Sequence, residues 1–189
     1  MTLFEYLAAA YVLMLSFAVL RAMSGVPHAV RSPLRYWVYI SWLSTALFLC
    51  LVCFWAFWPY RGVEWTIFTF LNALAIPALL FAHNSLLVPP DPSVVESWRD
   101  YFFKVRAALF ATGVVFMVTV TVSNQSTLGV APLHPSQLGN YALIAMYLLG
   151  LASKKPSVHV GLAVAFPSVL LVYVLSLATT PDSVFRPLQ

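Results

Sequence analysis

Two cysteines three residues apart are the first candidates for chemistry in this sequence. Cys50 and Cys53 form a C-x-x-C motif, the spacing of many redox sites. A reactive thiolate needs a helix N-terminus or a nearby cation, but these cysteines lie among Leu, Val, Phe and Trp residues inside a long apolar segment. The chain also has no further cysteine that could relay electrons. We therefore expect both thiols to pack in the interior, and loss of an activity on their alkylation would contradict this.

Histidine is the commonest metal-binding side chain, so the four histidines come next. His28, His83 and His159 fall toward one side of the membrane in the arrangement derived below, and the last two lie at a similar depth. The sequence has no H-x-x-x-H pair and no companion carboxylate at helical spacing. We therefore predict no metal site. If a metal bound, these three residues would be its candidates, and otherwise they bond to water, headgroups or backbone.

Two prolines occupy similar surroundings in separate apolar segments. Residues 73–80 and 163–170 both fit the pattern A-x-A-x-P-small-x-L, with Pro77 and Pro167 near the middle of a segment. Proline-interrupted helices at matching places in two inverted halves are typical of transporter sites. The pattern raises the hypothesis of a 3+3 inverted repeat with a transport or helix-break site at Asn72, Pro77 and Pro167. Asn72 is also expected to hydrogen-bond a neighbouring helix. A chance match of two alanine-rich helices is the alternative.

Large aromatic residues concentrate in the segment that holds the cysteines. Trp42, Phe48, Phe54 and Trp55 could form a face for a partner helix or a lipid. Ordinary packing and lipid-facing aromatics are the alternative. We predict no defined cofactor, and name lipid, quinone and pigment as molecules that such a face could hold.

The composition requires most of the chain to lie in a membrane. Of 189 residues, 61% are hydrophobic and only 8% are charged, against ~25% charged in soluble domains. The mean hydropathy is +0.87. Ten basic and six acidic side chains could not cover a water-facing surface. The net charge of +4 predicts no nucleic-acid binding, because basic residues of membrane proteins gather in the loops on one side.

Six segments are predicted to cross the membrane, since a spanning helix needs ~20 mostly apolar residues. The expected fold is all-α, a bundle of six transmembrane helices in a single domain over residues 1–189. The helices are expected at about 3–20, 36–58, 65–88, 93–122, 138–152 and 157–178. Ser93 stands three residues before Glu96, a capping-box pattern. The fourth helix is therefore expected to begin near Ser93, with its first turns at the membrane interface.

The basic residues give the six segments an orientation. If the N-terminus is non-cytoplasmic, the non-cytoplasmic side holds only Arg61 and Arg186 of the ten basic residues. The cytoplasmic side then holds Arg21, Arg31, Arg35, Arg99, Lys104, Arg106, Lys154 and Lys155. This agrees with the positive-inside rule. We therefore predict a multi-pass protein of the inner (cell) membrane with both termini on the non-cytoplasmic side.

These features leave three classes of function. The first is a non-enzymatic structural or accessory subunit of a membrane complex, or a self-associating bundle, whose partners are the bilayer and other membrane subunits or a second copy. The second is a small passive transporter or channel for a neutral or apolar solute, using the proline-containing third and sixth helices. The third is an enzyme acting on a lipid or quinone, for which no nucleophile–base pair or metal cluster can be read. We favour the first, and predict no catalytic residue.

Overall fold

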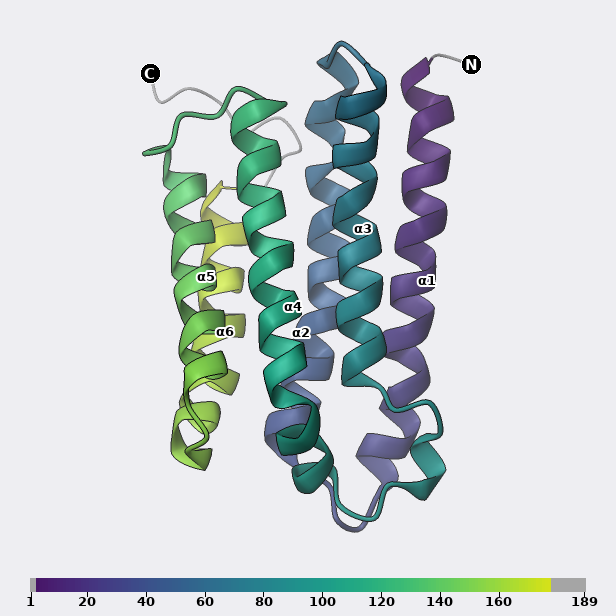
Figure 1. Cartoon of the computed structure of the whole chain (residues 1–189), viewed down its shortest axis with the longest axis vertical. Helices are drawn as coiled ribbons and strands as arrows, with labels where there is room; N and C mark the ends of the chain where they lie inside the picture. The colour runs from purple at the N-terminus through teal and green to yellow at the C-terminus, as the bar shows by residue number, and fades with distance from the viewer. Residues whose placement is uncertain (1–2, 178–189) are drawn as a thin grey trace.

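The computed structural model of the chain describes residues 3–177 as a bundle of six α-helices (Figure 1). Successive helices run in opposite directions, and no strand occurs in the described range. The helices are α1 (Leu3–Arg31), α2 (Trp37–Ala56), α3 (Ile67–Leu87), α4 (Trp98–Ser126), α5 (Pro135–Ala152) and α6 (Pro156–Leu177). Two short 3₁₀ turns, η1 (Trp58–Gly62) and η2 (Pro92–Val94), lie in the connections. The predicted all-α six-helix bundle is confirmed.

The helices form two layers. In one layer α1, α3, α4 and α5 lie side by side in that order, and each packs against the next. The other layer contains α2, which packs on α1 and α3, and α6, which packs on α5 and α2. The core between the layers is aromatic. Its centre holds the buried rings of Trp42, Phe110, Tyr147 and Phe166, which contact one another.

Five of the six helices are long and apolar enough to cross a membrane, and α5 is the exception. Its first turns carry Ser136, Gln137 and Asn140, which lower its mean hydropathy, yet all three side chains are buried in the bundle. The exposed face of α5 is apolar, with Leu138 and Leu148 among its residues. The helix thus turns polar groups inward and apolar groups outward, as expected of a membrane-embedded bundle. The chain is a membrane-embedded helical protein.

Three predicted helix boundaries are wrong: the end of the first helix and both ends of the fourth, since α4 ends at Ser126 rather than at 122. The first helix was expected to end at residue 20, but α1 continues to Arg31. The reason is that Arg21 reaches the end of α3 and hydrogen-bonds two carbonyls there, so a cation at this position does not stop the helix. The other four helices, α2, α3, α5 and α6, begin and end within three residues of the predicted positions.

The fourth helix begins at Trp98, five residues later than the predicted start at Ser93. Ser93 does not cap it, because its hydroxyl and its backbone N–H both donate to Asp91 and close the η2 turn. Ser97 is the N-cap, and its side chain accepts a hydrogen bond from the Asp100 backbone N–H. The chain from residues 92 to 97 is therefore a connecting segment, not an interfacial extension of α4.

The 3+3 relationship raised as a hypothesis does not extend to the packing of the first and third helices of each half. In the first half α1 packs closely along α3, whereas α4 and α6, the corresponding pair, make no comparable contact. Both α3 and α6 also continue as regular helices through Pro77 and Pro167. The prolines therefore do not divide these helices into half-helices with free ends.

We call the end of the bundle that holds the loops 32–36, 88–97 and 153–155 the basic end, and the opposite end the cavity end. Helix direction places eight cations at or near the basic end, namely Arg21, Arg31, Arg35, Arg99, Lys104, Arg106, Lys154 and Lys155. The cavity end holds η1 and the loop 127–134. The two ends therefore differ strongly in charge.

Candidate functional site: a polar cavity between four helices

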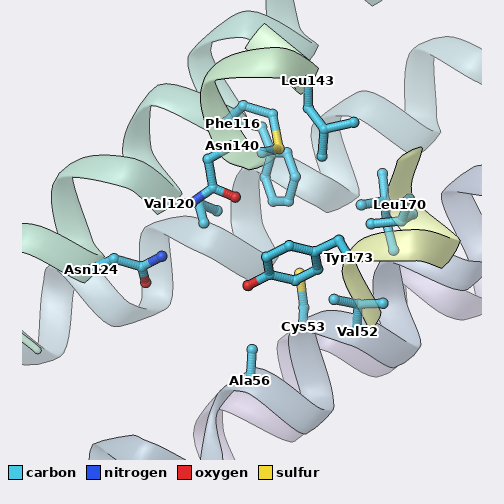
Figure 2. A pocket seen from close by; sticks show the side chains of 12 residues that line it. Val52, Cys53, Ala56, Phe116, Val120, Asn124, Asn140, Leu143, Leu170 and Tyr173 are labelled. Carbon is cyan, nitrogen blue, oxygen red and sulfur yellow. The ribbon is translucent and has the colours of Figure 1, made fainter. Parts of the chain in front are cut away.

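A small cavity lies between α2, α4, α5 and α6, toward the cavity end of the bundle (Figure 2). Its volume is about 60 Å³. It is lined by Leu49, Val52, Cys53, Ala56, Phe116, Met117, Val120, Asn124, Asn140, Leu143, Leu170 and Tyr173. The lining residues of each helix are adjacent or lie three or four positions apart, so each helix presents one face to the cavity.

A glycine on α5 shapes one wall of the cavity. A Cβ atom on Gly139 would lie 2.9 Å from the ring of Tyr173, closer than real side chains approach. The missing side chain therefore lets the Tyr173 ring lie directly against the α5 backbone. This contact fixes where the Tyr173 hydroxyl can point.

Three polar side chains reach this cavity, and their hydrogen-bonding capacity is largely unused. Asn124, Asn140 and Tyr173 point toward the same space (Figure 2). The Asn140 Nδ2 donates to the Gln137 Oε1 over 3.2 Å, which leaves the Asn140 carbonyl oxygen free within residues 3–177. The side chains of Asn124 and Tyr173 make no hydrogen bond to the described part of the chain. The cavity therefore offers donors and acceptors that the protein itself does not use.

The cavity is electrically neutral. Its lining contains no Asp, Glu, Lys, Arg or His, and Cys53 contributes its only thiol. Cys50 lies apart from the lining, where the Asn84 Nδ2 approaches its sulfur at 3.7 Å. Both cysteines are buried and free, and the groups around Cys53 provide no cation that would stabilise a thiolate. This environment suits the packing role expected for them.

The four aromatic residues named as a possible partner or lipid face do not share one face in the structure. Trp42 does not belong to such a face, because it is only 2% exposed and its ring contacts Phe110 and Phe166 in the core. Phe54 and Trp55 are exposed, and Phe48 is partly buried. A hydrophobicity pattern cannot separate these cases, since lipid and protein interior are both apolar.

The histidines do not converge on one site. His83 is buried and its ring contacts the ring of Tyr147 edge-on. The His159 Nε2 donates to the Ser153 carbonyl over 2.9 Å, and His28 is exposed at the basic end. Among residues 3–177, no group of three or more His, Cys, Asp or Glu side chains is placed to hold a metal ion.

Asn72, Pro77 and Pro167 are not brought together either. Asn72 bonds the neighbouring helix region as predicted, since its Nδ2 donates to the Ser123 Oγ at 3.0 Å and the Thr127 Oγ1 at 3.2 Å. Pro77 is buried in α3, while Pro167 lies in α6, and these two helices do not pack against each other. The structure thus gives the three residues no shared site.

At the basic end, buried and partly buried polar groups hold the helices together. The carbonyls at the end of α3 accept hydrogen bonds from side chains of three other helices. The Tyr101 hydroxyl donates to Leu86 (2.9 Å), the Tyr39 hydroxyl to Leu87 (3.0 Å), and the Arg21 guanidinium to Val88 (2.8 Å) and Pro89 (3.1 Å). A helix end leaves its last carbonyls without partners, and here two carbonyls of the last turn of α3 and the two that follow it each receive a donor.

The end of α5 is closed in the same way by Arg106 of α4. Its Nη1 donates to the carbonyls of Gly150 (2.6 Å), Leu151 (2.8 Å) and Ser153 (2.7 Å). A cation is favourable at a helix C-terminus, where the helix dipole is negative. Arg21 and Arg106 therefore act as caps of neighbouring helices, a role that their sequence positions alone do not reveal.

The polar lining of the cavity was not singled out from the sequence. Asn124 lies just beyond the predicted end of the fourth helix, so it is expected in a loop, whereas α4 continues to Ser126. The sequence does contain a signal for Asn140 and Tyr173. Both are polar side chains inside apolar helical segments, where polar groups often mark a functional site.

Comparison of the chain with protein-family models, with curated protein sequences and with solved structures gives no match.

Proposed function

We propose that this chain is a non-enzymatic component of a membrane assembly, which joins other membrane helices or a second copy of itself by packing. The observation that carries the proposal is how its buried polar groups are used. Arg21, Arg106, Tyr39 and Tyr101 bind helix ends, and no Asp, Glu, His, Lys or Arg lines the polar cavity, so its one thiol has no base or cation among the lining residues. The groups at the helix ends stabilise the fold, and the groups in the cavity can hydrogen-bond a ligand. Neither set forms the nucleophile–base pair that catalysis requires.

The half of α2 nearest the cavity end is the proposed contact face. Leu51 is 64% exposed, Phe54 is 55% exposed and Trp55 is 41% exposed, with the partly buried Phe48 one turn before Leu51. These side chains present a large apolar area with few rotatable bonds, which favours helix association through packing. α2 packs on α1, α3 and α6, so a partner docked on its exposed face would extend the layer that α2 and α6 form.

We also propose that the basic end faces the cytoplasm of a cell with an inner membrane, so that both termini are non-cytoplasmic. The unequal distribution of cations between the two ends supports this. Single cysteines placed at Ser93 and at Gly129, in loops at opposite ends, test it in a chain that lacks Cys50 and Cys53. A membrane-impermeant maleimide added to intact cells is expected to label only the cysteine at position 129. Labelling of only position 93 would reverse the orientation.

A passive transporter is the weaker candidate. It requires Pro77 and Pro167 to open a shared path, but their helices are continuous and do not pack together. The rings of Trp42, Phe110, Tyr147 and Phe166 fill the interior between the two layers.

Purification in mild detergent tests the main proposal. The full chain is expected to elute with another membrane protein, or with itself, at a fixed stoichiometry measured by light scattering. Replacing Leu51 and Phe54 with alanine should abolish this association. The control replaces Val164 and Leu171 on the exposed face of α6, and should retain it. A monomeric chain, or equal loss in both variants, would contradict the proposal.

A further inference from the structure

We infer that the cavity between α2, α4, α5 and α6 binds the head of an uncharged lipid that carries a hydroxyl or carbonyl group. The inference does not rest on the proposed subunit role, because a chain without a protein partner would keep this cavity. Three features of the cavity determine the chemical class of its ligand: its unused hydrogen-bonding groups, its lack of charge and its size.

The hydrogen-bonding groups require a polar ligand atom. Asn124 is 6% exposed and Asn140 is 5% exposed, so bulk water does not solvate them fully. The Asn124 carboxamide offers two donors and an acceptor, the Asn140 carbonyl an acceptor, and the Tyr173 hydroxyl one of each. Leaving such groups unpaired in an apolar interior is unfavourable. A hydroxyl or carbonyl placed between them would satisfy several at once.

The absence of charge excludes ions and charged headgroups. No ionised side chain lines the cavity. Its lining residues are apolar apart from the Cys53 thiol and the three polar side chains, Asn124, Asn140 and Tyr173. An ion would lose its hydration without gaining a counter-charge, which is strongly unfavourable in a membrane interior. Phosphate, carboxylate and ammonium heads are therefore disfavoured, whereas neutral alcohols, esters and glycerides are compatible.

The size of the cavity limits the part of the ligand that can enter. A cavity needs about 10–15 Å³ to hold one water molecule. A cavity of about 60 Å³ therefore admits only a few heavy atoms of the ligand. The remainder of the ligand must stay outside. The partly exposed lining residues Val52, Ala56, Val120 and Tyr173 mark the rim, and three of them are apolar. Such a rim suits a hydrocarbon chain that continues into the bilayer.

Binding of monooleoylglycerol to the full chain in mild detergent tests this inference. Native mass spectrometry and the shift in Tm are expected to show saturable binding. Oleate has a chain of the same length with a charged head, and glycerol has the head without the chain; neither should compete. Binding of glycerol alone would show a site for free polyols, and equal binding of oleate would show that the head is not recognised. Either result overturns the inference, as does the absence of binding by all three.

Matched variants locate the binding. Asn124→Leu removes hydrogen-bonding groups from the cavity and should weaken monooleoylglycerol binding by about tenfold. Thr112→Val removes a hydroxyl from the same helix, where it bonds only the Ala108 carbonyl, and should leave binding unchanged. If Asn124→Leu does not fold, Ala56→Leu narrows the cavity from its rim and should weaken binding similarly. Undiminished binding in the folded variant would place the lipid elsewhere.

Discussion

Two sets of buried or partly buried polar groups, at opposite ends of this bundle, are used in opposite ways. At the basic end, Arg21, Arg106 and Tyr39 each donate to carbonyls at the end of a neighbouring helix. At the cavity end, Asn124 and Tyr173 are directed into a small neutral space and donate to no described residue. Because a membrane provides no water to satisfy polar groups, a paired group stabilises the fold and an unpaired one favours a ligand. For these residues, the pairing state separates a structural role at the basic end from a binding role at the cavity end. The contrast does not extend to every polar group, since the His83 Nδ1, the Asn84 Oδ1 and the His159 Nδ1 toward the basic end are buried without a partner in the described range.

Arg106→Met should have the largest effect on stability. The substitution removes a buried cation and leaves three carbonyls of α5 and its following loop without this donor. We expect the free energy of unfolding to fall by about 3 kcal/mol. Reversible unfolding in mixed micelles measures this. Lys104→Met on the same helix is the control, since Lys104 is exposed and should change stability little.

Arg21→Met should cost less, about 2 kcal/mol. Arg21 is only partly buried and binds two carbonyls, while Tyr39 and Tyr101 continue to hold the end of α3. The same unfolding experiment measures the loss, with the exposed Arg31→Met as its control. If Arg21→Met were harmless, capping of α3 would not be a source of stability.

These two arginines also show what could not be predicted from the sequence. Hydropathy and the one-sided distribution of cations predict six helices and their directions, because both depend on local composition. The contacts of Arg21 and Arg106 depend on which helices become neighbours, and that is set by packing. The start of α4 was missed because Ser93 and Ser97 are equally good caps in sequence, and only the contact with Asp91 removes Ser93.

It was also hard to predict which face of each helix is buried in the bundle and which is exposed. Trp42 was named as a candidate for a partner or lipid face as well as for packing, and it is buried; the sequence could not distinguish these cases because lipid and protein interior select the same residue types. Of the candidate site residues, Asn72 has the predicted helix-to-helix bond, since a polar group in a span must find a partner. The cavity itself arises where four helices meet, and no local pattern encodes such a meeting point.

Tyr39→Phe provides a smaller test at the basic end. It removes the hydroxyl that donates to the Leu87 carbonyl and keeps the buried ring. A loss of about 1 kcal/mol in the free energy of unfolding is expected. The Tyr101→Phe variant should lose less, because Tyr101 is only partly buried and water can replace its hydroxyl. A larger loss for Tyr101→Phe than for Tyr39→Phe would show that burial does not set the strength of these bonds.

Tyr173→Phe should have the smallest effect on the lipid-free protein. The Tyr173 hydroxyl donates to no residue in the range 3–177, so its removal breaks no bond there. The free energy of unfolding is expected to change by less than about 0.5 kcal/mol. Unfolding in micelles of pure detergent provides the measurement. A loss as large as that of Tyr39→Phe would remove the distinction between the two ends.

The stabilisation that monooleoylglycerol gives to the wild type, to Tyr39→Phe and to Tyr173→Phe tests the central claim most directly. A ligand that binds only the folded state raises the free energy of unfolding in proportion to its affinity. Removing a tyrosine hydroxyl at the basic end should therefore leave this stabilisation unchanged, whereas removing one at the cavity end should reduce it. The account predicts equal stabilisation of the wild type and Tyr39→Phe, and clearly less for Tyr173→Phe. Equal stabilisation of all three proteins, or none, would contradict it.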